Sequence, residues 1–150
     1  MIKTEQQLRV MEEKLRHAEK SVKDTTGVEK DVLRDFAEEL SLEIAEYKRI
    51  LKGDERIFNV SGVSGIANAL IKARIARGLS QADLAEKLGK PAQSVQRDEA
   101  GGYERATLAR LADVADALGY HLAGVLEPAA PRRPLELGEL GLPATDDEAK

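Results

Sequence analysis

The sequence predicts an all-α protein in which an N-terminal antiparallel hairpin of two long helices, similar to a coiled coil, precedes a series of short helices. Hydrophobic side chains in the first 53 residues recur at alternating intervals of three and four, which is helical spacing. Glycines then divide the middle of the chain into short segments. Charged residues make up 33% of the chain and aromatic residues 3%, so the expected core is aliphatic.

The first helix is predicted from Thr4 to about Asp24. Thr4 is a suitable N-cap, and Gln7, three residues later, would complete a capping box. The hydrophobic positions of this segment have the heptad spacing of a coiled-coil seam. They are Leu8, Met11, Leu15, Ala18 and Val22.

The second helix is predicted from about Val28 to Lys52, with Gly53 as the residue that ends it. Its seam consists of Leu33, Ala37, Leu40, Ile44, Tyr47 and Leu51. Residues 1–53 would therefore form a hairpin. Two helices bury little surface by themselves, so we expect the hairpin to pack on a second copy, on a partner protein or on the next domain. The residues assigned to that dimer or partner contact are Leu8, Met11, Leu15, Leu33, Leu40, Ile44, Tyr47 and Leu51.

The remaining boundaries follow from composition. Residues 54–64 are expected to be a linker that docks through Ile57, Phe58 and Val60. Short helices separated by glycines occupy about residues 65–127. Residues 128–150 hold four of the five prolines and an acidic cluster, and we expect them to be disordered.

Charge and residue types exclude several classes of protein. The net charge is −4, but residues 66–97 contain six basic and two acidic side chains, a local excess of +4. The chain has no cysteine, so it has no disulfide or thiolate zinc site. Neither histidine lies in a metal-ligand spacing, so we expect no metal, no cofactor and no catalytic residue. No signal peptide or membrane segment is evident, which favours a cytoplasmic protein.

The most informative segment begins at Leu79. Ser80 is a good N-cap for a two-turn helix, and Gly89 would permit a left-handed turn after it. The next helix has one large hydrophobic residue, Val95, among polar neighbours, so its outer face is offered to a ligand. Glutamine and arginine are side chains that pair bidentately with adenine and guanine edges.

These features resemble the helix-turn-helix of the lambda-repressor/Cro-like family, also called the xenobiotic-response-element (XRE) family. Besides Gly89 and Val95, the matching residues include Ala85 and the segments Leu79-Ser80-Gln81 and Glu99-x-Gly101. The resemblance implies a five-helix domain over residues 65–127. In it, the helix from Gln81 crosses the DNA backbone and the helix over residues 92–98 enters the major groove.

The resemblance also assigns site residues. The base-reading positions are Ala92, Gln93, Gln96 and Arg97, and Ala92 can offer only a methyl contact to thymine. The expected phosphate contacts are Ser80, Gln81, Lys90, Tyr103 and Arg105, and Lys72, Arg77 and Lys87 would flank the footprint. Arg74 and Glu99 are expected to form a structural ion pair. Lys90 and Asp98 stand where the family usually has apolar residues, and we hypothesise that they pair with each other.

The first functional hypothesis is a sequence-specific regulator of transcription, a repressor that binds double-stranded DNA as a homodimer on an inverted repeat. The alternative is an antitoxin that neutralises a partner toxin and represses its own operon. A coiled-coil adaptor with a vestigial helix-turn-helix is weaker, because Gln93, Gln96 and Arg97 would then have no reason to cluster.

Overall fold

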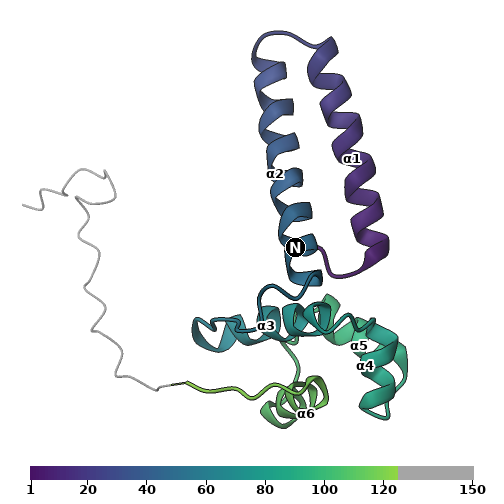
Figure 1. Ribbon diagram of the computed structural model, residues 1–150, viewed down its shortest axis with the longest axis vertical. Coiled ribbons are helices and arrows are strands. Elements are labelled where there is room, and N and C mark those ends of the chain that lie inside the picture. Colours follow the sequence, from purple (N-terminus) through teal and green to yellow (C-terminus); the bar gives the residue numbers. More distant parts are fainter. Residues whose placement is uncertain (125–150) are drawn as a thin grey trace, which may run out of the picture.

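The computed structural model describes residues 1–124, and these form six α-helices and no strand (Figure 1). The helices are α1 (Glu5–Asp24), α2 (Val28–Leu51), α3 (Gly62–Ala76), α4 (Gln81–Lys87), α5 (Ala92–Ala100) and α6 (Leu108–Leu118). The prediction of an all-α fold with an N-terminal hairpin is confirmed. Four helices rather than five follow the hairpin in the described part of the chain, because residues 120–124 are not helical. The predicted tail over residues 128–150 lies outside the described residues.

Helix α1 begins as predicted, with one change in its cap. The Oγ1 of Thr4 accepts a hydrogen bond from the backbone N–H of Gln7 at 3.2 Å. The reciprocal bond of a capping box is displaced by one residue, because Gln7 Oε1 accepts from the N–H of Lys3 at 2.8 Å instead of from Thr4. Gln7 therefore fixes the segment that enters the helix as well as its first turn.

The predicted seam packs α1 against α2 within one chain, so the dimer or partner contact assigned to its buried residues Leu40, Ile44 and Tyr47 was wrong. Ala18, Leu40, Ile44 and Tyr47 are buried, and most other seam residues are half-buried. The assignment of Leu51 was wrong: Leu51 is 40% exposed, whereas its neighbour Ile50 is 1% exposed. The heptad spacing ends here because α1 does not extend alongside the last turn of α2. Ile50 packs instead in the core that also contains Ile2 and residues of α3.

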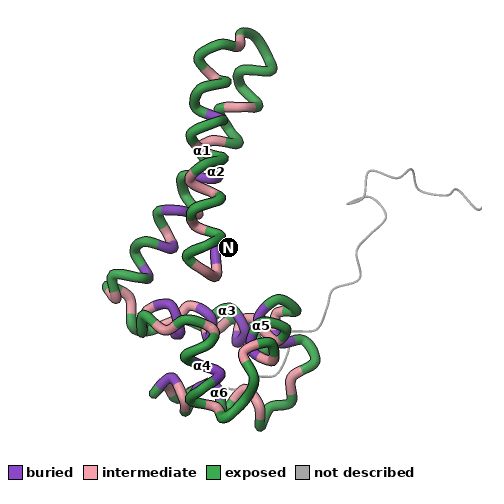
Figure 2. Tube along the Cα trace, turned by 90° about the vertical axis from the view of Figure 1, so that its right-hand side faces the viewer, coloured by how far each residue is buried: buried purple, intermediate pink, exposed green. Residues whose placement is uncertain are grey.

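The hairpin and the four following helices share this one hydrophobic core. It joins Ile2, Ile44, Tyr47 and Ile50 to buried residues of α3, α4, α5 and α6. Figure 2 shows that the buried residues gather in the lower hairpin and in the helices beneath it, whereas the far end of the hairpin is mostly exposed. The hairpin is therefore anchored at one end only.

The predicted linker is shorter than expected and docks in part. Helix α3 already begins at Gly62, inside the range assigned to the linker. Phe58 and Val60 pack against the core, but Ile57 is exposed. The Phe58 ring lies 6.1 Å from the ring of Tyr120, so the linker and the segment after α6 lie together.

Candidate nucleic-acid interface

The first turn of α4 is closed by a reciprocal capping box. The Oγ of Ser80 accepts from the N–H of Asp83 at 3.1 Å, and the Asp83 carboxylate accepts from the N–H of Ser80 at 2.8 Å. These hydrogen bonds, side-chain first and then backbone, hold the pKa of Asp83 below its ordinary value. The hydroxyl oxygen of Ser80 is thus engaged in the cap, while its proton remains available to a ligand.

The turn between α4 and α5 depends on Gly89. Its φ of 61° is left-handed, a conformation that costs an ordinary residue about 1–2 kcal/mol. The N–H of Lys90 donates to the carbonyl of Ala85 at 2.9 Å, which closes the end of α4. This tight turn sets the direction in which α5 leaves.

Helix α5 presents one face to the core and the other to solvent. Val95 and Glu99 are completely buried, and Ala92, one turn earlier, is half-buried against the core. Gln93, Gln96 and Arg97 lie on the exposed face, and their side chains form no hydrogen bond within the described residues. The structure therefore brings three of the four predicted base-reading residues onto one accessible surface, while Ala92 contributes at its edge.

A buried ion pair fixes α5 to α3. The exposed fractions of the Arg74 and Glu99 side chains are 3% and 0%. Arg74 Nε donates to Glu99 Oε1 at 2.6 Å, and its Nη2 donates to Glu99 Oε2 at 2.7 Å, a bidentate geometry. Two further donors of the guanidinium reach backbone carbonyls of Leu79 and Lys3, each at 2.8 Å. Four of the five N–H groups of Arg74 are thus engaged within the fold.

Gln81 belongs to the same buried network. Its Nε2 donates to Glu99 Oε2 at 2.8 Å, and the residue is half-buried. The predicted phosphate contact of Gln81 would therefore have to be made by its backbone N–H or by the part of the amide that faces solvent. The side chain itself ties the start of α4 to the end of α5.

Residues 70–125 match the model of the helix-turn-helix family. No curated protein and no solved structure matched the chain. The match covers the last part of α3, the α4–turn–α5 unit and α6, and it leaves out the hairpin. The matched segment shares one hydrophobic core with the hairpin.

Tyr103, within the matched segment, is not the exposed phosphate ligand that we expected. Its side chain is a core residue, and the whole residue is 6% exposed. Gly102 and Tyr103 both have positive φ, 60° and 55°, and this double left-handed turn directs the ring inward. Burial, followed by the nearby carboxylates of Glu99 and Asp98, raises the pKa of Tyr103 above its ordinary value. Arg105, two residues later, is exposed.

The expected pairing of Lys90 with Asp98 is absent. Lys90 is exposed and forms no ion pair within residues 1–124, whereas Asp98 Oδ2 accepts from Arg110 Nη2 at 3.0 Å and from its Nε at 3.2 Å. Asp98 points toward α6 rather than back toward the turn. The Asp98–Arg110 pair therefore joins α5 to α6 and leaves Lys90 free for a phosphate.

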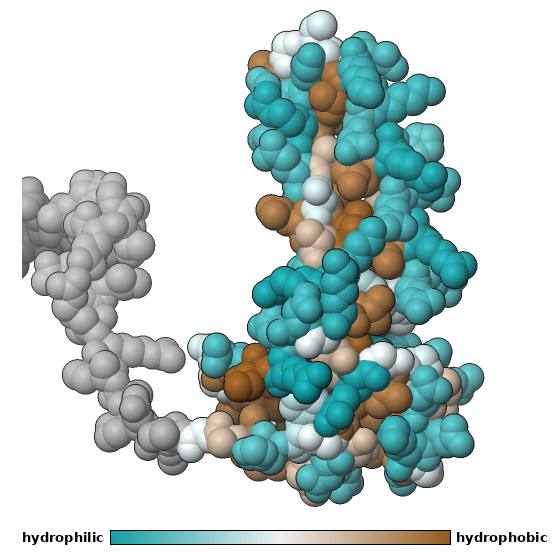
Figure 3. Space-filling model, viewed as in Figure 1, coloured by the Kyte–Doolittle hydropathy of each residue, from teal (hydrophilic) through white to brown (hydrophobic). Residues whose placement is uncertain are grey.

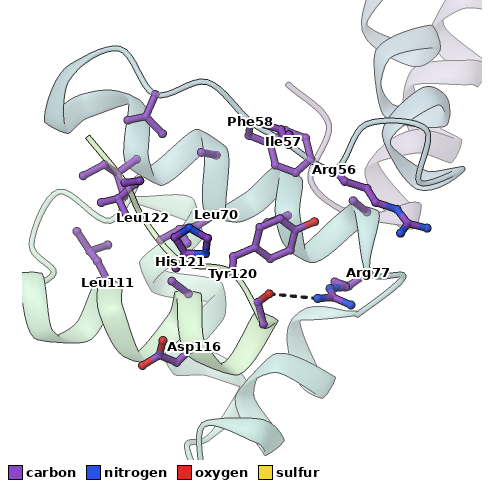
Figure 4. A pocket seen from close by; sticks show the side chains of 18 of the residues that line it. Arg56, Ile57, Phe58, Leu70, Arg77, Leu111, Asp116, Tyr120, His121 and Leu122 are labelled. Atoms are coloured by element: carbon purple, nitrogen blue, oxygen red, sulfur yellow. Dashed lines mark hydrogen bonds between the residues drawn. The ribbon is translucent and has the colours of Figure 1, made fainter. Parts of the chain in front are cut away.

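Some basic residues of the segment over residues 66–97 form contacts within the fold, whereas others are exposed to solvent. Lys72 donates to Glu46 of the hairpin at 2.6 Å. Arg77 donates to the carbonyl of Gly119 at 3.2 Å and lies 5.3 Å from the centre of the Tyr120 ring (Figure 4). Neither residue flanks the α5 surface as expected. The exposed basic residues that remain are Lys87, Lys90, Arg97 and Arg105.

Arg77 lines a different feature, a groove of about 1200 Å³ between the linker, α3 and α6. Figure 4 shows Phe58, Leu70, Leu111 and Tyr120 around it. This groove and the exposed face of α5 have no residue in common.

None of the helices within residues 1–124 combines the length and the hydrophobicity that a membrane span requires. The same residues contain no group of three or more side chains that could together hold a metal ion.

Sequence reasoning missed two contributors to the site. They are Lys3, which accepts a hydrogen bond from Arg74, and Arg110, which donates to Asp98 of α5. Lys3 lies far from α5 in the sequence, and Arg110 lies on another helix. The contact of Arg110 could have been predicted from the sequence, because Arg110 is a basic residue in the first turn of the next helix and Asp98 is an acidic residue that needed a partner. Lys3 had no such signal, since its carbonyl accepts from Arg74 and its Nζ donates to the backbone carbonyl of Glu99, and contacts with backbone atoms do not depend on the partner's residue type.

Proposed function

We propose that this protein is a sequence-specific regulator that represses transcription as a homodimer on an inverted repeat. The observation that carries the proposal is the exposed face of α5, where Gln93, Gln96 and Arg97 stand together on a helix fixed from behind by Val95 and Glu99. A rigid helix with free amide and guanidinium groups suits the hydrogen-bonding edges of base pairs in the major groove.

The surroundings of that face support the same function. Ser80 stands at the start of α4, and Lys90 and Arg105 are exposed in the loops on either side of α5. In such an arrangement, phosphate contacts set the register and base contacts select the sequence. A repressor acts by occupying a DNA site, so this function requires no catalytic residue in the chain.

Selection of bound duplexes from a random pool tests the proposal directly. We expect a two-fold symmetric consensus whose half-sites lie about 10 base pairs apart, centre to centre. Binding of the selected duplex should exceed binding of unselected DNA by about 10³-fold or more at physiological salt. Equal affinity for both kinds of duplex would contradict a sequence-specific role.

The antitoxin alternative adds a partner protein to the same DNA-binding activity. Its support is the far end of the hairpin, which carries exposed hydrophobic residues and lies away from the shared core (Figure 3). Co-expression with a small protein encoded beside this chain would test it. Formation of a stable complex that removes the partner's toxicity would favour the antitoxin; absence of any complex would leave the repressor alone.

A further inference from the structure

The far half of the hairpin lacks the third layer that usually buries a helical pair. In α1 only Ala18 is buried, and the seam residues around it are half-exposed. Two helices alone rarely bury enough hydrophobic surface to be stable, so such a pair normally packs on another layer. Figure 3 shows hydrophobic surface running along the hairpin between polar margins.

One side of the hairpin carries a shallow groove of about 600 Å³. Its rim on α1 consists of residues spaced by four, three and four, which places them on one helical face. They are Val10, Lys14, His17 and Ser21; Glu13 also lines the groove, and its floor contains Ala18 and Leu33. On α2 the groove is bordered by Phe36, which is 45% exposed.

The face of α2 on this side has the same spacing. Val32, Phe36, Glu39 and Glu43 follow one another at intervals of four, three and four. Val32 and Phe36 supply exposed hydrophobic surface, and Glu39 supplies a free carboxylate. The α1 face thus carries one lysine, Lys14, beside Glu13, and on the α2 face Glu43 is paired with the N-terminal amine at 2.8 Å while Glu39 forms no ion pair within residues 1–124.

We infer that this groove face is the homodimer interface, in which two hairpins pack as a four-helix bundle with a two-fold axis along the bundle. In that symmetry α1 of one copy lies beside α2 of the other, so every neighbouring pair of helices is antiparallel. The two-fold axis places Lys14 against the partner's Glu39. The occupant is a second copy because the two faces have the same spacing and because Lys14 on one face and Glu39 on the other are opposite charges without a partner in their own chain.

The heights of these residues along the hairpin are consistent with this pairing. Lys14 precedes the loop at residues 25–27 and Glu39 follows it, each by about three helical turns. The Lys14 and Glu39 side chains form no ion pair within residues 1–124. Each charge is therefore available to the other copy at the same level of the bundle.

This inference rests on the proposed function for one feature, the direction of the axis. A two-fold axis along the bundle puts both helix-turn-helix domains at the same end, where they can reach two half-sites of one inverted repeat. An antiparallel arrangement would place the domains at opposite ends of a bundle about 30 Å long. Only the first arrangement suits half-sites one helical turn of DNA apart.

Sedimentation equilibrium of the full chain without DNA tests the interface. We expect wild type to be a dimer and Phe36→Glu to be a monomer with unchanged helix content, because the substitution would place a charge in the apolar groove. Leu42→Glu is the matched control, since Leu42 lies on α2 outside the groove lining and is 72% exposed. It should remain a dimer.

Charge reversal tests the pairing without touching hydrophobic residues. Lys14→Glu and Glu39→Lys should each raise the dimer dissociation constant by about tenfold or more, and the double variant should restore it. A monomeric wild type, a dimeric Phe36→Glu variant, an equal loss in Leu42→Glu or no rescue in the double variant would each overturn the inference. Since no DNA is present, a dimer that lacks sequence preference would refute the proposed function and leave the interface standing.

Discussion

The backbone carbonyl of Lys3 accepts a hydrogen bond from Nη2 of Arg74 at 2.8 Å, across 71 positions of sequence. Arg74 in turn holds Glu99, which is completely buried at the end of α5. The entry to the hairpin is therefore connected, through one guanidinium, to the helix that presents the proposed base-reading residues. A domain that is defined by the family match alone would lack this hydrogen bond, because the match begins at residue 70.

Neutralising Glu99 should strongly destabilise the protein. In Glu99→Gln the Arg74 guanidinium keeps its charge in a buried site without a counter-charge, so we expect a loss of about 3–5 kcal/mol in the free energy of unfolding. Urea unfolding followed by circular dichroism measures it. Replacing both partners, Arg74→Met with Glu99→Leu, should cost less than either single change. Additive effects of the two single variants would show that the residues do not act as a pair.

Ile2 should stabilise the whole molecule although it lies outside the helix-turn-helix match. Its exposed fraction is 2%, and it belongs to the core shared with α3. Ile2→Ala should lower the free energy of unfolding by about 2–5 kcal/mol. The control is Ile57→Ala, at a residue that is 81% exposed, where we expect a change of less than about 0.5 kcal/mol. Similar values for the two variants would mean that the N-terminal segment is not docked.

Gly89 should not tolerate a β-branched residue. Valine at φ 61° is strained, so Gly89→Val should cost at least about 1–2 kcal/mol of stability. Asparagine accepts this conformation more readily, which makes Gly89→Asn the milder comparison. No side-chain or backbone atom lies within 4 Å of the position a Cβ would occupy, so the cost measures backbone strain alone. Equal melting temperatures of the three proteins would contradict the turn geometry.

Arg97 should determine sequence preference rather than general affinity. Arg97→Ala is expected to weaken binding of the selected duplex by about 1–3 kcal/mol and to relax the preference at one base pair of each half-site. Fluorescence titrations with the selected duplex and its single-base variants measure both quantities. If the variant keeps the wild-type base preference at every position, α5 is not the reading helix.

The salt dependence of DNA binding should reflect the exposed cations only. Replacing Lys90 or Arg105 by alanine should reduce the slope of log K against log salt by about 0.9 for each phosphate that the protein then leaves unneutralised. Lys72→Ala should leave the slope unchanged, because Lys72 is bound to Glu46 of the hairpin. A comparable reduction in the Lys72 variant would place the DNA on the other side of the domain.

The sequence was sufficient to predict the structure of a short segment wherever that structure depends only on the residues of the segment itself. The cap at Ser80, the left-handed turn at Gly89 and the buried position of Val95 depend on residue type and local spacing, and all three are present in the structure. The Arg74–Glu99 pair also followed from a family pattern of fixed spacing. The hairpin seam was predictable up to Tyr47 because heptad spacing describes two helices that lie side by side.

Contacts between distant segments were decided only by the tertiary structure. Leu51 and Ile50 are both plausible seam residues, and the choice between them depends on where α1 begins and on the approach of Ile2 and α3. Asp98 had two oppositely charged candidates, and the position of α6 selected Arg110. Tyr103 is polar enough for a surface loop, but two successive left-handed residues turn it into the core. Residue type and spacing fix what a segment can do by itself, whereas burial and charge pairing depend on which surfaces the completed fold brings within a few ångströms of each other.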